Sequence, residues 1–204
     1  EDITFTANDG TATVSDTIRV TVLPVNDAPT LAAIPAQGVM EDALFTYTAV
    51  GNDIDTGDVL TYSLTTFPVG MLIDSATGEI TWTPTNDDVG AHDVTVKVTD
   101  LAGATATTDF VITVTNTNDA PVLEMFLPDV EFDEDTGVAG AFDLDNYFSD
   151  VDSGLIYSSA GAVDVIVTIN GDGTVDFGAT ANWFGFEDIT FTANDGTATV
   201  SDTI

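Results

Sequence analysis

Two pairs of aspartates, each separated by one residue, could do the clearest chemistry in this sequence. Asp53-Ile54-Asp55 lies in a loop rich in Gly and Asn, and Asp150-Val151-Asp152 lies in a similar loop further along the chain. Alternate residues of an extended segment face the same way, so each pair directs two carboxylates toward one point. Calcium in proteins is held by about six to eight oxygen atoms of carboxylates, amides and carbonyls. Both loops therefore predict calcium ligands, and Asx turns are the alternative interpretation.

Other acidic and amide side chains lie near the ends of the expected strands, where they could join the same ligand sets. They are Glu41-Asp42, Asp87-Asp88, Asp100, Asn116, Asn118, Asp119, Glu134-Asp135, Glu187-Asp188 and Asp195. Scattered acids such as Asp16 and Asp164 are expected only to keep the surface solvated. The candidate ligands thus concentrate at segment ends, where loops of neighbouring domains meet.

The charge balance excludes several classes of partner. The 204 residues include 35 Asp or Glu and only two basic residues, Lys97 and Arg19, for a formal net charge of −33. Because so acidic a chain repels phosphate groups, we expect no nucleic-acid partner and no binding to anionic membranes. The absence of cysteine excludes disulfides and thiolate chemistry. No apolar run reaches the roughly 18 residues of a membrane span, so no direct membrane insertion is expected.

Nothing in the sequence indicates catalysis. The single histidine, His92, has no nucleophile motif near it, and the acid pairs come without the pattern of a glycosidase cleft. Residues 170–173 read Asn-Gly-Asp-Gly, which resembles the start of an EF-hand loop. The Glu that would close such a loop is missing, so a hairpin turn is expected there. The chain is therefore predicted not to be an enzyme.

The elements that must position the acids are nearly all strands. Apolar and polar residues alternate over 3–7, 45–49, 60–64, 94–98 and 165–169, and Thr and Val dominate these runs. Turn signals such as Asn8-Asp9-Gly10 punctuate them, and no helical stripe is present. About seven short strands per repeat, with one apolar face, predict a β-sandwich. Four aromatic residues are expected in its cores, with stacking on sugars as the alternative. They are Trp82, Trp183, Phe184 and Phe186.

Internal repetition divides the chain. Residues 1–18 are identical to residues 187–204, and Asn-Asp-Ala-Pro occurs at 26–29 and again at 118–121. We predict three parts. Residues 1–26 are the C-terminal strands of a preceding repeat, 27–118 form a complete repeat, and 119–204 form a second kind of repeat truncated in its last strand. On this interpretation Ile204 would be followed by the sequence seen at 19–25, and the chain is expected to be a fragment of a longer protein.

The same repetition predicts strand exchange between copies. Segment 1–22 of one molecule could replace residues 187–204 of another and add the missing strand. Such an exchange is head-to-tail, and it need not close into a ring.

The two junctions resemble the D-x-N-D-N-x-P calcium linker of the cadherin family, in its bacterial cadherin-like versions. They read Pro-Val-Asn-Asp-Ala-Pro over 24–29 and Asn-Thr-Asn-Asp-Ala-Pro over 116–121. Residues 27–118 resemble the dystroglycan-type cadherin-like repeat, also named the Putative Ig repeat, through segments 67–74, 77–84 and 98–103. Residues 119–204 resemble the tandem cadherin-like repeats of giant bacterial adhesins, through 133–136, 147–152 and 182–196. The resemblance implies an all-β fold of tandem Ig-like, cadherin-like Greek-key β-sandwiches.

The resemblance also implies a calcium site at each junction. For the second junction it implies Glu41, Asp87, Asp88, Asn116, Asn118, Asp119, Asp150, Asp152 and Asp195. For the first it implies Asn26, Asp27, Asp53, Asp55 and Asp100, with only Glu1 or Asp2 from the preceding repeat. Ala28 and Ala120 stand where the fuller family motif has Asn. We therefore expect fewer ions per junction than in eukaryotic cadherins.

The expected function follows from this resemblance. It is a calcium-binding repeat pair of a large adhesin, extracellular or on the bacterial cell surface, in which Ca²⁺ stiffens an extended stalk. The expected partners are neighbouring repeats of the same array, with homophilic or polysaccharide contacts in cell adhesion. The alternatives are a carbohydrate-binding accessory module of a secreted enzyme, and a spacer that needs no ion.

Overall fold

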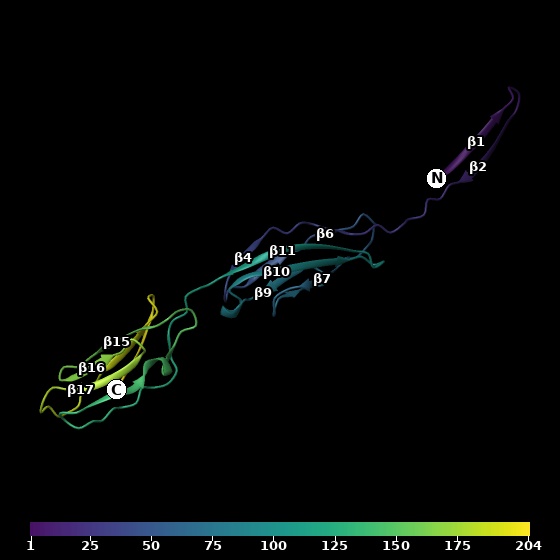
Figure 1. Ribbon diagram of the computed structural model, residues 1–204. Helices are drawn as coiled ribbons and strands as arrows, with labels where there is room; N and C mark the ends of the chain where they lie inside the picture. The colour runs from purple at the N-terminus through teal and green to yellow at the C-terminus, as the bar shows by residue number, and fades with distance from the viewer. The chain divides into compact units, whose positions relative to one another are not determined.

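The computed structural model describes residues 1–204 and confirms the predicted all-β fold (Figure 1). Its only helices are two short 3-10 turns, η1 (Asn86–Asp88) and η2 (Leu144–Asn146). None of its helices has the length and apolar character that crossing a membrane requires. The chain forms two compact units. The first comprises Glu1–Gln37, Phe45–Trp82 and His92–Ile112, and the second comprises Gly38–Leu44, Thr83–Ala91 and Thr113–Ile204.

The first unit is built from short strands arranged in small sheets. It begins with the hairpin of β1 (Asp2–Asn8) and β2 (Thr13–Arg19), and β3 (Thr30–Leu31) pairs with β6 (Gly51–Asn52). A three-stranded sheet has the order β5 (Phe45–Thr48), β9 (Glu79–Trp82), β8 (Leu72–Ile73). A four-stranded sheet has the order β4 (Gln37–Met40), β11 (Thr105–Thr115), β10 (Gly90–Thr99), β7 (Thr61–Thr66). Strands β4, β10 and β11 continue into the second unit.

Alternation along β10 produces the core of the first unit. Val94, Val96 and Val98 are fully buried while the residues between them are partly exposed. Such a period of two buries one face of a strand and leaves the other solvated. Trp82 is also buried, as expected, and its indole N–H donates to the Val69 carbonyl at 3.1 Å. The β-branched residues of the sequence thus supply the packed face that supports the loops at the strand ends.

The second unit has three small sheets. β12 (Val122–Leu123) pairs with β14 (Phe148–Ser149). The second sheet has the order β13 (Gly137–Asp143), β17 (Thr174–Ala179), β16 (Val165–Ile169), and the third has the order β15 (Ile156–Ala160), β18 (Thr190–Asn194), β19 (Thr199–Thr203). Their inward faces meet in an aromatic core, in which the Phe142 ring lies 5.5 Å from that of Phe191 and 5.8 Å from that of Phe177.

Two aromatic residues of this unit do not pack as the sequence predicts. Phe184 is 84% exposed and Phe186 is 89% exposed, so the expectation of core packing is wrong for both. They lie in residues 180–189, which form no strand, and the alternation that buries side chains in a sheet does not operate there. Trp183, which directly precedes Phe184, is partly exposed.

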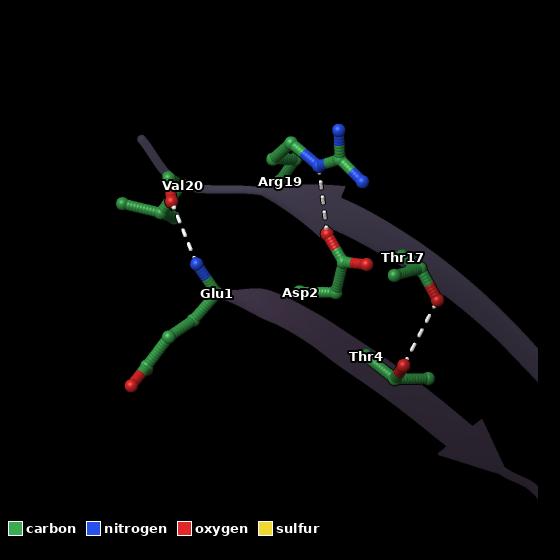
Figure 2. Close-up of polar contacts among 6 residues, drawn as sticks. All are labelled: Glu1, Asp2, Thr4, Thr17, Arg19 and Val20. Carbon is green, nitrogen blue, oxygen red and sulfur yellow. Dashed lines mark hydrogen bonds and ion pairs between the residues drawn. The ribbon is translucent and has the colours of Figure 1, made fainter. Parts of the chain in front are cut away.

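The N-terminal hairpin is held by contacts between its own two strands. The N-terminal ammonium of Glu1 donates to the Val20 carbonyl at 3.0 Å, and Arg19 bonds Asp2 at 3.1 Å. The hydroxyls of Thr4 and Thr17 lie 2.9 Å apart (Figure 2). Every residue of both strands is exposed, so this hairpin buries none of its apolar side chains.

Candidate metal centre

Two groups of three carboxylates converge in the structure. Glu41, Asp119 and Asp152 form one cluster, and each places an oxygen atom within 4.8 Å of the others. All three belong to the second compact unit. Asp53, Asp58 and Asp100 form the other cluster with the same spacing, and all three belong to the first unit. We call them the Glu41 cluster and the Asp53 cluster.

Glu41 is held at the point where β4 and β11 end, by hydrogen bonds of its backbone and its side chain. Its backbone N–H donates to the Thr115 carbonyl at 3.1 Å, just beyond β4, and its carboxylate accepts the N–H of Thr117 at 2.5 Å. The next residue, Asp42, has a positive φ of 58°, which turns the chain away from the strand. Glu41 is only 3% exposed, an unusual degree of burial for a carboxylate.

The Asp150–Asp152 loop presents its second carboxylate to the same place. The Asp150 side chain accepts the backbone N–H of Asp152 at 2.9 Å, an Asx turn that fixes the loop. Asp152 then accepts the N–H of Asp119 at 2.6 Å and the amide of Asn86 at 2.6 Å. The Asp119 N–H, aided by the Asn86 and Asn116 amides, lowers the pKa of Asp152 against the opposing effect of burial.

The Asp53 cluster repeats the same local pattern. Asp53 accepts the N–H of Asp55 at 2.8 Å, and Asp55 accepts the N–H of Asp27 at 2.8 Å. The amide of Asn26 donates to Asp100 at 2.9 Å, just as the amide of Asn118 donates to Asp195 at 2.9 Å beside the other cluster. The Asn26 hydrogen bond is the main cause of a lowered pKa at Asp100. The pKa of Asp195 is also lowered, first by the Ala198 backbone N–H and then by Asn118.

The donors present fit a hard cation. Four carboxylate oxygens at these places are buried and accept no hydrogen bond: Glu41 Oε2, Asp53 Oδ2, Asp58 Oδ2 and Asp150 Oδ2. A buried anionic oxygen without a partner is costly, because it has lost water and gained nothing. Neither cluster has a Lys or Arg among the partners of its carboxylates. A divalent ion with oxygen ligands would satisfy these atoms, and it would also offset the repulsion among three carboxylates.

The structure places the expected ligands unevenly. Each cluster contains one expected aspartate of an Asp-x-Asp loop, Asp53 or Asp152, and the other expected members are Glu41, Asp100 and Asp119. Asp55 and Asp150 belong to neither cluster. Asp87 is exposed and lies outside both clusters, while Asp88 accepts the N–H and hydroxyl of Thr85 as the cap of η1. Asp2 bonds Arg19 of its own hairpin. Glu187 accepts three backbone N–H groups, from Val163, Asp164 and Val165.

One member of the clusters, and one residue that bonds to a member, were not expected from the sequence. Asp58 completes the Asp53 cluster, and burial, followed by the charges of Asp53, Asp100 and Asp55, raises its pKa. Its position as a third acid in the same loop was the available signal. Asn86 donates to Asp152, and it directly precedes the acid pair 87–88 that was expected instead.

Comparisons with known proteins agree with this fold. Residues 28–115 match the family described as "Putative Ig domain", and residues 118–204 match the family described as "Bacterial Ig domain". Neither is a catalytic domain, and no curated protein matches the chain. The first match contains Glu41 and the second contains Asp119 and Asp152, so the Glu41 cluster draws on residues of both.

Cadherin ectodomains are among the similar solved structures. PcdhgB3 EC1-4 is 20% identical with a TM-score of 0.66, covering 100% of this chain and 56% of that one. Human CDH23 EC21-23 is 18% identical with a TM-score of 0.59, covering 94% of this chain and 67% of that one. The chain thus spans about half of PcdhgB3 EC1-4, and at these identities the likeness shows the fold. The chain is thus a tandem of immunoglobulin-like domains, the first matching the Putative Ig domain family and the second the Bacterial Ig domain family, and its β-sandwiches resemble cadherin repeats.

Proposed function

We propose that this chain is a calcium-binding repeat pair of a bacterial surface or secreted adhesin, in which Ca²⁺ stiffens an extended stalk. The observation that carries the proposal is the set of buried carboxylate oxygens without partners in the two clusters. Bacterial Ig domains are typical of surface and secreted proteins, which supports the extracellular location.

The ligand sets suggest how the ion would act. In the Glu41 cluster, Glu41, Asp119 and Asp152 would hold the ion, with Asp150 and its unpartnered oxygen beside them. Glu41 and Asp152 come from different matched domains, so an ion bound by both would restrain one domain against the other. When bound, the ion supplies positive charge and coordination only, and no reaction is required. The contribution of the chain is to fix the acids through the backbone hydrogen bonds that each accepts.

Calorimetric titration with CaCl₂ tests the proposal. The chain should bind calcium with Kd of about 10⁻⁴–10⁻³ M, the range of extracellular modules. Asp152→Asn should remove binding at the Glu41 cluster and Asp100→Asn at the Asp53 cluster. Asp109→Asn, an exposed acid outside both clusters, is the matched control and should bind like the parent. No heat and no change in melting temperature at millimolar calcium would leave a spacer that needs no ion.

A further inference from the structure

The turn between β16 and β17 contains the only Asn-Gly pair of the sequence, Asn170-Gly171. Two backbone hydrogen bonds close this turn. The N–H of Gly173 donates to the Asn170 carbonyl at 3.1 Å, and the N–H of Asn170 donates to the Thr174 carbonyl at 2.8 Å. Gly171 is exposed, and a Cβ at its position would meet no atom within 4 Å. Neither carboxylate cluster includes a residue of this turn, so the proposed calcium sites give it no role.

An asparagine followed by glycine can react with its own backbone, and asparagine is among the thermolabile residues of proteins. The nitrogen of the next residue attacks the carbon of the side-chain amide. A cyclic imide forms, and the amide nitrogen leaves as ammonia with the proton that the attacking nitrogen loses. Water then adds to one of the imide carbonyls and opens the ring, which gives aspartate or isoaspartate. Glycine favours the attack because it has no Cβ to shield its nitrogen and because its backbone rotates freely.

The structure separates Asn170 from the other asparagines. The nitrogen can attack only when it is turned toward the amide carbon, and a hydrogen bond from its N–H directs it toward another acceptor. In seven of the ten asparagines the N–H of the next residue makes such a bond, and these are Asn8, Asn26, Asn116, Asn118, Asn146, Asn182 and Asn194. Asn52 and Asn86 are followed by aspartates, whose side chains shield the nitrogen. Only after Asn170 is the next residue a glycine, and its N–H donates to no group of the structure.

Two hydrogen bonds restrain the reacting amide. The side-chain nitrogen of Asn170 donates to Thr174 Oγ1 at 3.1 Å and to Asp176 Oδ2 at 3.2 Å. Both distances lie at the long end of the range for N–H···O bonds, so the restraint is weak. The side chain is only partly buried, so water reaches it. The turn therefore holds the amide weakly and leaves the attacking nitrogen without a competing acceptor.

The product of the reaction cannot keep these contacts. A carboxylate has no proton to donate at neutral pH, and it would repel the carboxylate of Asp176 where the amide donates to it. Asp176 also accepts the N–H of Gly140 at 2.7 Å, so the same carboxylate links β13 to β17. Isoaspartate in addition lengthens the backbone of a turn whose strands are paired up to Ile169 opposite Val175. Conversion of Asn170 therefore weakens the hairpin of β16 and β17.

We propose that Asn170 is a modification site, at which the Gly171 nitrogen converts the asparagine into aspartate and isoaspartate with water as the only other reactant. The change adds a negative charge to the second unit and destabilises the β16–β17 hairpin. It spares the asparagines beside the carboxylates of the clusters, because the N–H groups that follow Asn26 and Asn118 donate to Asp55 and Asp152. Calcium takes no part, so a test in EDTA is separate from that of the proposed function.

Incubation of the chain in EDTA at mildly alkaline pH, in water enriched in heavy oxygen, tests the site. Digestion with a Glu-specific protease and tandem mass spectrometry should show that residue 170 exchanges its amide nitrogen for heavy oxygen while the other asparagines stay intact. Gly171→Ala should slow the change several-fold, because its Cβ shields the nitrogen. Gly154→Ala is the matched control and should react like the parent, since a Cβ there also meets no atom within 4 Å and no asparagine precedes it. An intact Asn170 in the parent, or an unchanged rate in Gly171→Ala, would overturn the proposal.

Thermal unfolding in EDTA tests the consequence for the hairpin. Asn170→Asp has the aspartate product from the start, and it should melt at a lower temperature than the parent because the contacts with Thr174 and Asp176 are lost. Asn146→Asp adds the same charge at an exposed asparagine of η2, and as the control it should lower the melting temperature less. Equal melting temperatures for these two variants would refute the destabilisation of the hairpin.

Discussion

Within the Asp53 cluster, the pKa values of two neighbouring carboxyls are shifted in opposite directions. The Asn26 amide lowers the pKa of Asp100, while burial and the charges of Asp53, Asp100 and Asp55 raise that of Asp58. Without a cation, the negative charge of Asp58 is therefore disfavoured by burial and by repulsion from the neighbouring carboxylates. Its Oδ2 atom is buried and accepts no hydrogen bond, which agrees with the direction of the shift.

We predict that Asp58→Asn stabilises the calcium-free chain at neutral pH. Because the pKa of Asp58 is raised in the folded state, the native chain binds more protons than the unfolded chain at pH values just above 3.8. The stability of the native chain therefore falls as the pH rises from 3.8 through the raised pKa. The variant lacks this loss, and its advantage over the parent should disappear at pH values below the window. Urea unfolding in EDTA at several pH values measures it.

In calcium the parent chain should be more stable than Asp58→Asn, because the ion would bind the negative charge that the substituted side chain lacks. Asp109→Asn, outside the cluster, should show neither the advantage nor the reversal. A variant less stable than the parent at neutral pH in EDTA would mean that the negative charge of Asp58 is already compensated.

Spacing in the sequence identifies part of each site. The Asp-x-Asp pairs point to the two loops, because alternation in an extended segment is a local property. Asn86 was missed because its approach to Asp152 depends on how separate loops fold back, which local spacing does not encode. Asp58 lies in the same loop as Asp53, but it falls outside the Asp-x-Asp spacing. Asp88 illustrates the reverse case, since its side chain caps η1 by bonding Thr85.

At the scale of elements, the turn of residues 74–78 in the first unit leaves little room for a larger side chain. Asp74 accepts the N–H groups of Ala76 and Thr77, and Gly78 has a positive φ of 74°. A Cβ at Gly78 would lie 2.7 Å from the Ala49 carbonyl oxygen and 3.1 Å from the Tyr62 ring. Both neighbours are buried parts of the sandwich, so they have little room to move.

We predict that Gly78→Ala destabilises the first unit by more than Gly103→Ala does. Both glycines have a positive φ, but nothing lies within 4 Å of a Cβ at Gly103. The Gly103 variant should lose roughly 1–2 kcal/mol, the cost of left-handed backbone for alanine. The Gly78 variant should lose this and an added cost of displacing Ala49. Urea midpoints with unchanged slopes would measure both, and equal losses would contradict the predicted steric clash.

Strands were more predictable than loops. The runs 45–49, 94–98 and 165–169 coincide with β5, β10 and β16, since alternation is what makes a half-buried strand. Strands of two residues such as β3 and β12 have no period to detect. For the same reason the burial of Trp82 in β9 was predicted correctly, whereas Phe184 and Phe186 in a loop were not.

At the scale of the whole molecule, the net charge is the reason to expect a response to calcium. A net charge of −33 opposes compactness, and the two clusters concentrate part of it at fixed points. A ligand that binds only the folded state raises stability with concentration, by about 2.7 kcal/mol per site at 100 times Kd. We therefore predict that the melting temperature rises with CaCl₂ and falls back on adding EDTA. NaCl at equal ionic strength is the control, and an equal rise with NaCl would indicate screening alone.

The proposed stalk makes a further prediction about the freedom of the two matched domains. Because Glu41 and Asp152 come from different domains, an ion bound by both should narrow the range of their relative arrangements. Small-angle X-ray scattering of the chain should give a narrower distribution of maximum dimensions in CaCl₂ than in EDTA. Adding Asp152→Asn should make the two curves alike. Identical curves in CaCl₂ and EDTA without Asp152→Asn would show that a bound ion restrains only its own loops. That result would contradict the stalk function and leave the binding site unaffected.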